Sequence, residues 1–118
     1  MNRLAIVVPC FNEEEVLKST NKLLLKTIEK LMQRGKINDS SFILYVDDGS
    51  KDNTWDIIKK NDQESKHVYG LKLAGNVGHQ NALIAGMLAV KDLSDMVVSI
   101  DADYNVHACQ DTRSKYLR

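Results

Sequence analysis

Short apolar runs alternate with longer amphipathic segments along most of the chain. Four runs are rich in β-branched and aliphatic residues, at 4–8, 42–46, 68–73 and 96–100, and each predicts a β-strand. The first is a continuous apolar run, which is typical of a strand buried on both faces. Pro9 is predicted to end this strand.

Three helices are predicted between the strands. Apolar side chains recur at three- and four-residue spacing over 13–34, and Gly35 is the expected terminator of this first helix. Asp52 or Asn53 is expected to cap the second helix. The third helix, 80–90, is rich in alanine and glycine, so its backbone can lie close to a sheet.

The order of these elements, β-α-β-α-β-α-β, predicts the fold class. It indicates an α/β protein of three layers, with a mostly parallel sheet, right-handed crossovers and a Rossmann-like order. A chain of 118 residues is long enough for one domain with a core and too short for two. We expect residues 1–103 to form this unit, and residues 104–118, which show no clear period, to form an irregular or partly helical tail.

The charge balance excludes some classes of partner. The 16 basic and 16 acidic residues give a formal net charge of +0, so there is no long-range attraction to nucleic acid or to an anionic membrane. No apolar run approaches the roughly 18 residues that a membrane span needs. Cys10 and Cys109 lack metal-ligand spacing and fit a reducing, cytoplasmic setting.

Polar residues follow the end of every predicted strand. In an open parallel sheet the C-terminal ends of the strands lie along one edge, where ligands bind. The segments 9–13, 47–50, 76–79 and 101–103 are therefore expected to converge on that edge.

The last of these segments contains two acids separated by one residue. Alternation along an extended chain points Asp101 and Asp103 the same way. Two like charges at that spacing are costly unless a positive charge lies between them, and a divalent cation that carries a phosphate ligand suits oxygen donors. The alternative is a strand end with two solvated acids.

Ordinary structural roles compete with binding roles at the other positions. Asp47 and Asp48 also suit a turn in which their side chains accept hydrogen bonds from backbone amides. Asn76 and Gly78 also suit a turn. Glu13 also suits the first turn of a helix, where an acid interacts favourably with the helix dipole.

The four polar segments resemble the motifs of the family 2 glycosyltransferases with the GT-A fold. They occur in the family's order, and the segment 78–80 resembles the bacterial branch that is similar to dolichol-phosphate mannose synthase and the bactoprenol glucosyltransferases. The resemblance implies that this chain is the N-terminal half of a GT-A fold. The matching segments are 7–14, 46–54, 76–83 and 101–103.

The resemblance also implies a nucleotide-sugar site. Pro9, Phe11 and Glu13 would shape the wall around uracil and ribose. Asp47 would accept a hydrogen bond from the uracil ring, and Asp101 would lie near the ribose. The implied binding set is Pro9, Phe11, Glu13, Asp47, Asn76, Gly78 and Asp101.

A divalent metal is part of the implied site. Asp101 and Asp103 match the family's Asp-x-Asp, so the resemblance implies that they hold Mg²⁺ or Mn²⁺ on the diphosphate. Asn105 stands where this branch has a glutamine that can touch the metal, and its shorter amide departs from that pattern. Such a metal stabilises the charge that develops on a nucleoside diphosphate as the sugar departs.

The implied activity is transfer of a hexose from a UDP-sugar. The acceptor would be a polyprenyl phosphate or a polysaccharide, and the full-length enzyme would act at the inner face of the cytoplasmic membrane. Family members are much longer, and their second half carries the acceptor site and the general base. No catalytic base is assignable in this chain, so we expect a truncated donor-binding half that is inactive as a transferase when alone.

Two other functions remain open from the residues alone. A phosphoacceptor receiver domain has the same alternating pattern, but it needs a lone aspartate after the third strand, where this chain has Leu73, Ala74 and Gly75. A noncatalytic interaction module on a Rossmann-like scaffold is the other alternative. An open sheet edge also invites pairing with a second chain, so a homodimer is a further prediction.

Overall fold

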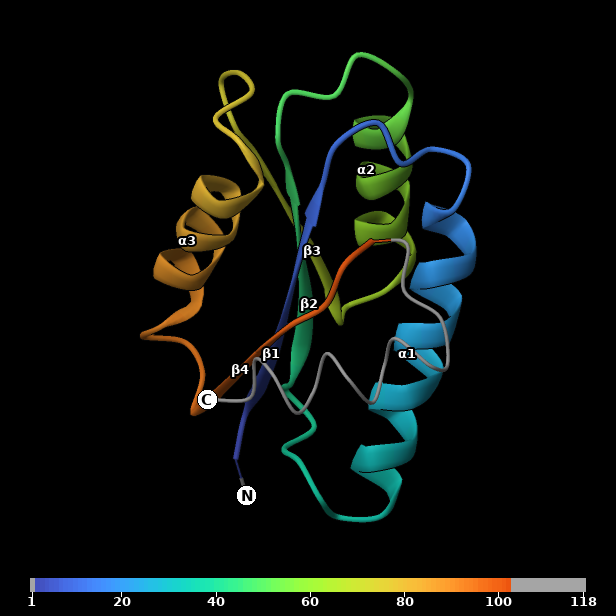
Figure 1. Cartoon of the computed structure of the whole chain (residues 1–118). Coiled ribbons are helices and arrows are strands. Elements are labelled where there is room, and N and C mark those ends of the chain that lie inside the picture. Colours follow the sequence, from blue (N-terminus) through green and yellow to red (C-terminus); the bar gives the residue numbers. More distant parts are fainter. Residues whose placement is uncertain (1, 103–118) are drawn as a thin grey trace.

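The strands form one parallel sheet at the centre of the molecule (Figure 1). The computed structural model describes residues 2–102, so the predicted tail at 104–118 lies outside the described residues. The strands are β1 (Leu4–Cys10), β2 (Phe42–Asp47), β3 (Val68–Lys72) and β4 (Met96–Ser99). Their order across the sheet is β3-β2-β1-β4, and every neighbouring pair is parallel.

Helices cover both faces of the sheet and complete three layers. Helices α1 (Leu17–Gln33) and α2 (Thr54–Glu64) lie on one face, and α3 (His79–Val90) lies on the other (Figure 1). The α/β class, the parallel sheet and the β-α-β-α-β-α-β order are therefore confirmed. No helix among residues 2–102 has the length and apolar character that a membrane crossing requires.

The strand order reverses between β1 and β4. The chain adds β2 and β3 on one side of β1 and then crosses to the other side to add β4. This is the first part of the Rossmann order 3-2-1-4, and it differs from the 2-1-3-4-5 order of flavodoxin-like folds, to which receiver domains belong. In such sheets, the crevice at the reversal point is where ligands bind. Within the described residues β4 is an edge strand, and the homodimer stays a prediction.

The prediction that Pro9 ends the first strand is wrong, because β1 continues to Cys10. Pro9 pairs with Val46 of β2. On the other side of β1, the last bond to the β4 segment is donated by the Ile100 N–H to the Val7 carbonyl, at 3.1 Å. Alternation turns the nitrogen of Pro9 toward this same side, beyond the last ladder bond, so its missing N–H breaks no hydrogen bond.

Helix α1 begins later than the sequence predicts. It starts at Leu17, and the expected first residue, Glu13, lies in a preceding turn where its carbonyl accepts the N–H of Leu17 at 3.0 Å. The predicted terminator is confirmed. Gly35 has φ 69°, its N–H bonds the Met32 carbonyl at 3.0 Å, and the following Lys36 N–H bonds the carbonyl of Leu31 at 2.9 Å. These two bonds are the Schellman arrangement.

Two apolar clusters hold the layers together, one on each face of the sheet. The first joins α1 and α2 to β1, and its members include Leu17, Leu24, Ile28, Ile58 and the segment after β4. The second joins α3 to the other face of β1 and β2. Its buried members are Ala5, Val7, Phe42, Leu44, Val46, Ala82 and Val90.

The backbone of α3 packs close to the sheet, as its small residues predict. Gly86 faces the two central strands, and a Cβ placed there would lie 2.6 Å from a methyl of Val7 and 2.7 Å from a methyl of Val46. Both valines are fully buried and have stiff χ1 angles, so they have little room to move away. Gly86 therefore sets the distance between α3 and the sheet.

The sequence offers Asp52 and Asn53 as candidates for the cap of α2, and Asp52 supplies it. Asn53, which flanks α2, makes no side-chain cap bond, whereas Asp52 Oδ1 accepts the backbone N–H of Thr54 at 2.9 Å and its hydroxyl at 2.5 Å. Asp52 Oδ2 also accepts the N–H of Glu14 at 3.3 Å. Burial raises the pKa of Asp52, but these hydrogen bonds outweigh it and hold the pKa below its ordinary value.

We predict that Gly86→Ala destabilises the fold despite the better helix propensity of alanine. The added methyl overpacks the contact with Val7 and Val46, so the free energy of unfolding falls by about 1–2 kcal/mol net of propensity. Urea denaturation measures it. Gly75→Ala is the matched control, since no atom lies within 4 Å of a Cβ at that position. Equal free energies of unfolding for Gly86→Ala and Gly75→Ala would contradict the close packing of α3 on the sheet.

We predict that Asp52→Ala lowers the free energy of unfolding by about 0.5–2 kcal/mol at pH 7, the usual value of a helix cap. Because the pKa of Asp52 is depressed in the folded state, its contribution is present above about pH 4 and is lost as the pH falls through the folded pKa. The difference in the free energy of unfolding between Asp52→Ala and wild type should therefore be smaller at pH 3 than at pH 7, as measured by urea denaturation. Asp62→Ala, at an exposed site of the same helix, is the control. A gap that does not change with pH would contradict the assignment.

Candidate functional site at the strand ends

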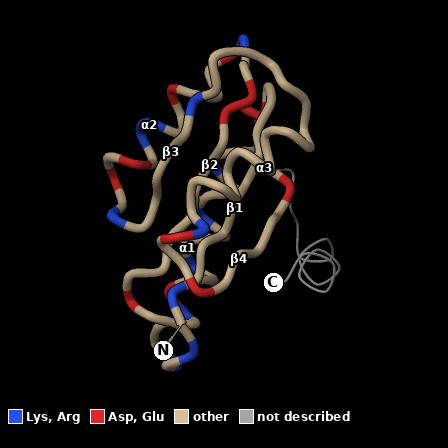
Figure 2. The backbone as a smooth tube through the Cα atoms, turned by 90° about the vertical axis from the view of Figure 1, so that its left-hand side faces the viewer, with Lys and Arg blue, Asp and Glu red and all other residues tan. Residues whose placement is uncertain are grey.

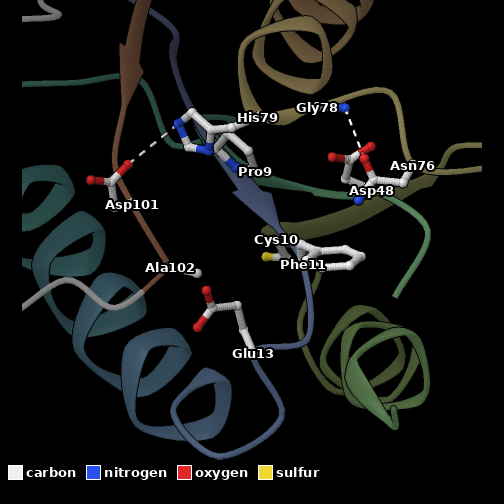
Figure 3. Close-up of a pocket in the computed structure, with 10 residues that line it drawn as sticks. All are labelled: Pro9, Cys10, Phe11, Glu13, Asp48, Asn76, Gly78, His79, Asp101 and Ala102. Carbon is white, nitrogen blue, oxygen red and sulfur yellow. Dashed lines mark hydrogen bonds and ion pairs between the residues drawn. The ribbon is translucent and has the colours of Figure 1, made fainter. Parts of the chain in front are cut away.

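A pocket of about 460 Å³ opens at the C-terminal ends of β1 and β4. In Figure 3 its lining residues surround the end of β1, with Asp101 and Ala102 on one side and Asp48 and Asn76 on the other. The pocket therefore lies where the strand order reverses, as expected for an open α/β sheet. The lining residues are Pro9, Cys10, Phe11, Glu13, Asp48, Asn76, Gly78, His79, Asp101 and Ala102.

Hydrogen bonds fix the loop after β1 to the loop after β2 and to the first residue of α2. Asn12, at φ 53°, donates its N–H to Ser50 Oγ at 2.9 Å, and its Oδ1 accepts the N–H of Lys51 at 2.9 Å. The Glu13 N–H donates to Thr54 Oγ1 at 2.8 Å. Asparagine tolerates this left-handed backbone better than most residues. These bonds place the neighbouring Phe11 and Glu13 on the pocket wall.

The turn after β3 is fixed to the end of β2 in a similar way. Asp48 Oδ1 accepts the Val77 N–H at 2.7 Å, and Asn76 Oδ1 accepts the Gly78 N–H at 3.1 Å. Gly49, at φ 74°, allows the close approach, because a Cβ there would lie 2.6 Å from the backbone nitrogen of Asn76. Asp48 thus accepts a backbone N–H, one of the roles that the sequence analysis allows for it, and it also lines the pocket.

Asp47 does not line the pocket. Its side chain is fully buried, and the residue pairs with Cys10 on β1. Asp47 Oδ1 accepts the N–H of Ser50 at 3.2 Å, whereas Oδ2 has no hydrogen-bond partner among the described residues. An unpaired buried carboxylate oxygen is uncommon, because burial without a partner costs free energy. The predicted contact of Asp47 with uracil stays a prediction.

Asp101 and His79 lie next to each other on the pocket wall (Figure 3). His79 Nε2 lies 3.7 Å from Asp101 Oδ1, and more than half of each side chain is exposed. His79 is the first residue of α3, so this pair joins the start of a helix to the end of β4. The next residue, Ala102, is buried and belongs to the apolar cluster that joins α1 and α2 to β1.

The pocket is acidic. Glu13, Asp48 and Asp101 line it, and none of the lining residues in the described part of the chain is Lys or Arg. Acidic positions near the ends of β2 and β4 are visible in the upper part of Figure 2. Burial raises the pKa of the Cys10 thiol, and the charges of Glu13 and Asp47 raise it further, so Cys10 stays a neutral thiol.

Of the three predicted metal ligands, the described residues include only Asp101. No group of three or more His, Cys, Asp or Glu side chains that could hold a metal occurs within residues 2–102, and the predicted ligands Asp103 and Asn105 lie outside that range. Asp101 is exposed at the rim. A Mg²⁺-type ion bound with a diphosphate takes most of its ligands from phosphate and water and needs only one or two carboxylates. The exposed carboxylate of Asp101 is a ligand of the kind that such an ion takes.

Most of the predicted binding set meets at the pocket. Pro9, Phe11, Glu13, Asn76, Gly78 and Asp101 line it together. The lining residues outside that predicted set are Cys10, Asp48, His79 and Ala102. Each of these is adjacent in sequence to a predicted residue, so the rule that strand ends converge already indicated their positions.

Comparison with known proteins connects this pocket to an enzyme family. The model of glycosyl transferase family 2 matches residues 5–108. An uncharacterized glycosyltransferase of Bacillus subtilis (strain 168), YkoT, is 50% identical over 115 residues, covering 96% of this chain and 34% of that protein. The undecaprenyl-phosphate 4-deoxy-4-formamido-L-arabinose transferase of Shewanella sediminis (strain HAW-EB3) is 36% identical over 101 residues, which is 85% of this chain and 28% of that protein. The chain thus spans about a third of the length of these relatives.

Solved structures share the fold. Residues 1–349 of S. aureus TarS superpose with a TM-score of 0.67 at 20% identity, over 95% of this chain and 31% of that one. Glucosyl-3-phosphoglycerate synthase from Mycobacterium tuberculosis, solved with Mn²⁺ and UDP, gives 0.61 at 21% identity, over 86% of this chain and 33% of that one.

The family model covers nearly all of the described sheet and every strand end that lines the pocket. The half GT-A fold expected from the sequence motifs is confirmed. The chain belongs to glycosyl transferase family 2.

Proposed function

We propose that this chain is the donor-binding part of a hexosyltransferase, and that its donor is a nucleoside-diphosphate hexose, with UDP-hexose expected. One observation carries the proposal. In a chain that belongs to glycosyl transferase family 2, the segments after all four strands gather at one pocket of about 460 Å³ at the reversal point of the sheet. That volume lies within the range of small-molecule sites, roughly 300–1,000 Å³.

The ligands of structurally similar proteins support this donor class. Structures of S. aureus TarS residues 1–349 were solved with UDP and with UDP-GlcNAc, and each shares the fold of this chain. A Pyrobaculum calidifontis mannosyltransferase was solved with GDP-Man and Mn²⁺. The ligands in these structures differ in base and sugar, so together they support a nucleotide-sugar donor in general. The preference for uracil is part of our proposal.

The charge of the pocket supports a divalent cation as part of the complex. A diphosphate is an anion, and Glu13, Asp48 and Asp101 would repel it if it entered alone. When bound, Mg²⁺ or Mn²⁺ stabilises the negative charge of the leaving diphosphate. Asp101 and Asp103 are the proposed ligands, with Asn105 as a third.

Each part of the pocket has a proposed role toward the donor. Pro9 and Phe11 form an apolar wall for the base and ribose, and Glu13 and Asp101 accept hydrogen bonds from ribose hydroxyls. The N-terminus of α3, which begins at His79, carries the positive end of the helix dipole and favours phosphate nearby.

Asp47 is proposed to contact the base. Its buried Oδ2 has no partner among the described residues, and the imide N–H of uracil is a donor of the required kind. Because Asp47 is fully buried, this contact needs a movement of the pocket wall. Cys10, which pairs with Asp47 across the sheet, is the wall residue beside it.

The proposed acceptor of the whole enzyme is a polyprenyl phosphate. Two relatives that match this chain, from Shewanella sediminis and Proteus mirabilis, are named undecaprenyl-phosphate transferases. Such an acceptor is membrane-bound, so the proposed place of action is the cytoplasmic face of the membrane. This chain spans about a third of the relatives, and the general base is unassigned among its residues.

We predict that Mn²⁺ strengthens UDP binding to this chain, and that Asp103→Ala abolishes the metal-dependent part with little change in thermal unfolding. The reason is that Asp103 is proposed to hold the ion on the diphosphate. Calorimetric titration with UDP, with and without Mn²⁺, measures the effect.

Asp92→Ala is the matched control for this experiment. It removes the same charge at an exposed site beyond the C-terminal end of α3, at the opposite end of that helix from the pocket. Asp103→Ala that binds UDP and Mn²⁺ like wild type would show that the metal assignment is wrong. Panels with GDP and ADP in place of UDP test the base preference.

We predict that the purified 118-residue chain transfers no sugar from UDP-hexose to polyprenyl phosphate in detergent, even where it binds UDP. Binding needs only the pocket, whereas transfer needs a general base and an acceptor surface. Radiolabelled hexose measured in the lipid fraction is the readout. Detectable transfer above a no-protein blank would overturn this expectation and place the base among these residues.

A further inference from the structure

A second pocket, of about 380 Å³, opens between helices α1 and α2. These helices lie side by side on one face of the sheet (Figure 1). The pocket shares no lining residue with the one at the strand ends in the described part of the chain. We call it the α1–α2 groove, and its lining residues are Lys18, Asn21, Lys22, Leu25, Ile57, Lys60, Asn61 and Glu64.

The lining residues come from one face of each helix. On α1 they follow the spacing i, i+3, i+4, i+7 from Lys18, and on α2 they follow the same spacing from Ile57. A helix face that is turned to a neighbouring helix is usually apolar. Here only Leu25 and Ile57 are apolar, and both pack against the cluster beneath the helices. Packing therefore does not explain the polar majority of the groove.

Two of the lining residues are buried asparagines, one from each helix. Asn21 is 8% exposed and Asn61 is 7% exposed. Tyr45 donates its hydroxyl to Asn21 Oδ1 at 2.7 Å, so the oxygen end of that amide is occupied. Asn61 Nδ2 has no hydrogen-bond partner among the described residues. A buried donor without a partner costs free energy, so a ligand that supplies an acceptor would be favoured here.

Three lysines surround these amides. Lys18, Lys22 and Lys60 are exposed, and none of them belongs to an ion pair within residues 2–102. Lys18 and Lys22 are four positions apart on α1, a spacing at which like charges repel. Glu64 is the one acid in the lining set, so the groove has a surplus of two positive charges. The protein itself leaves this charge without a counterion among the described residues.

We propose that the α1–α2 groove binds a phosphate group, at a site separate from the donor pocket. A phosphate ester carries a charge of about −1.5 to −2 at pH 7, which matches the surplus of positive charge. Lysines bind phosphate as point charges, and amide NH₂ groups donate to its oxygens. Soluble esters and phospholipid head groups both carry this group. The inference does not depend on the proposed function.

A phosphate oxygen reaches Asn61 Nδ2 only after a small movement, because that atom is covered in this structure. The rim of the groove consists mainly of exposed lysines. Exposed side chains change rotamer within nanoseconds, so the rim can open without a change in the backbone.

A structural role for Asn61 predicts a different outcome from a binding role. A residue that holds two helices together contributes to stability, so its replacement lowers stability. An unpartnered buried donor instead lowers the stability of the wild type, and leucine, which has a similar branched shape, removes it. A group that costs stability and faces unpaired cations is typical of a binding site.

The test is a titration of the ¹⁵N-labelled 118-residue chain with sodium phosphate, at an ionic strength held constant with NaCl. Two-dimensional NMR resolves the backbone amides and the side-chain NH₂ group of Asn61. Lys60→Gln and Asn61→Leu are the test variants. Lys59→Gln is the matched control, since Lys59 is adjacent on α2, lies 3.8 Å from Asp56 and does not line the groove.

We expect phosphate to shift the Asn61 NH₂ resonances saturably. Lys60→Gln should weaken binding about threefold, the effect of one exposed charge, and Lys59→Gln should bind like wild type. Asn61→Leu should weaken binding about tenfold, the effect of a lost hydrogen bond to a charged group, as followed by the backbone amides of the groove. The same variant should unfold at a higher urea concentration than wild type.

Several results would overturn the phosphate site. One is a set of shifts confined to the donor pocket, at the amides of Phe11, Gly78 and His79. Another is equal weakening in Lys60→Gln and Lys59→Gln, which would indicate diffuse attraction to charge. A third is Asn61→Leu that binds phosphate like wild type or unfolds at a lower urea concentration.

Two further probes identify the source of the phosphate. Glycerol 3-phosphate represents a soluble ester, and dihexanoylphosphatidic acid below its micelle concentration represents a lipid. Shifts at Asn61 with either probe support the site. Tighter binding of the lipid would identify a membrane source, and equal binding would identify a soluble one. Loss of UDP binding at the donor pocket would overturn the proposed function and leave these expectations unchanged.

Discussion

The central position of β1 is the constraint from which both the fold and the pocket follow. β1 pairs in parallel with β2 on one side and β4 on the other, and all seven of its residues are buried. Parallel pairing forces each connection to cross a face of the sheet, so every strand ends at the same edge. Because the order reverses between β1 and β4, the polar segments after these strands leave a gap between them. The position of the pocket thus comes from strand pairing, before any single side chain is considered.

The pattern of apolar residues predicted the strands and helices well. Hydrogen bonds and neighbouring strands decided where each of them begins and ends. A continuous apolar run has few alternatives to a strand covered on both faces, and the run before Pro9 is such a case. The sequence could not show that Pro9 would continue the strand, because that depends on how far β4 extends alongside it. Likewise Glu13 has good helix propensity, but its N–H is taken by Thr54, a residue of another helix, and α1 begins only at Leu17.

The same division applies to the candidate site. The rule that parallel strands end at one edge was enough to bring Phe11, Asn76 and Asp101 together. It could not decide which of the adjacent acids Asp47 and Asp48 would line the pocket. That choice depends on the close contact of the next loop with the backbone of Asn76 and on the bond from Asp48 to the turn after β3. Contacts of this kind join residues far apart in sequence, and no local pattern contains them.

The buried Asp47, which does not line the pocket, and the exposed Asp101, which does, have different proposed tasks. Asp101 is exposed, so in the proposed complex it can share a cation with a diphosphate at the cost of little desolvation. Asp47 is fully buried, and one of its oxygens has no partner among the described residues. Leaving such an oxygen unpaired costs on the order of 1–3 kcal/mol, which a donor arriving with the ligand would return. A neutral N–H satisfies that oxygen without bringing a second charge into the interior. Burial therefore suits the proposed recognition of a base by Asp47, and exposure suits the proposed contact of Asp101 with a metal.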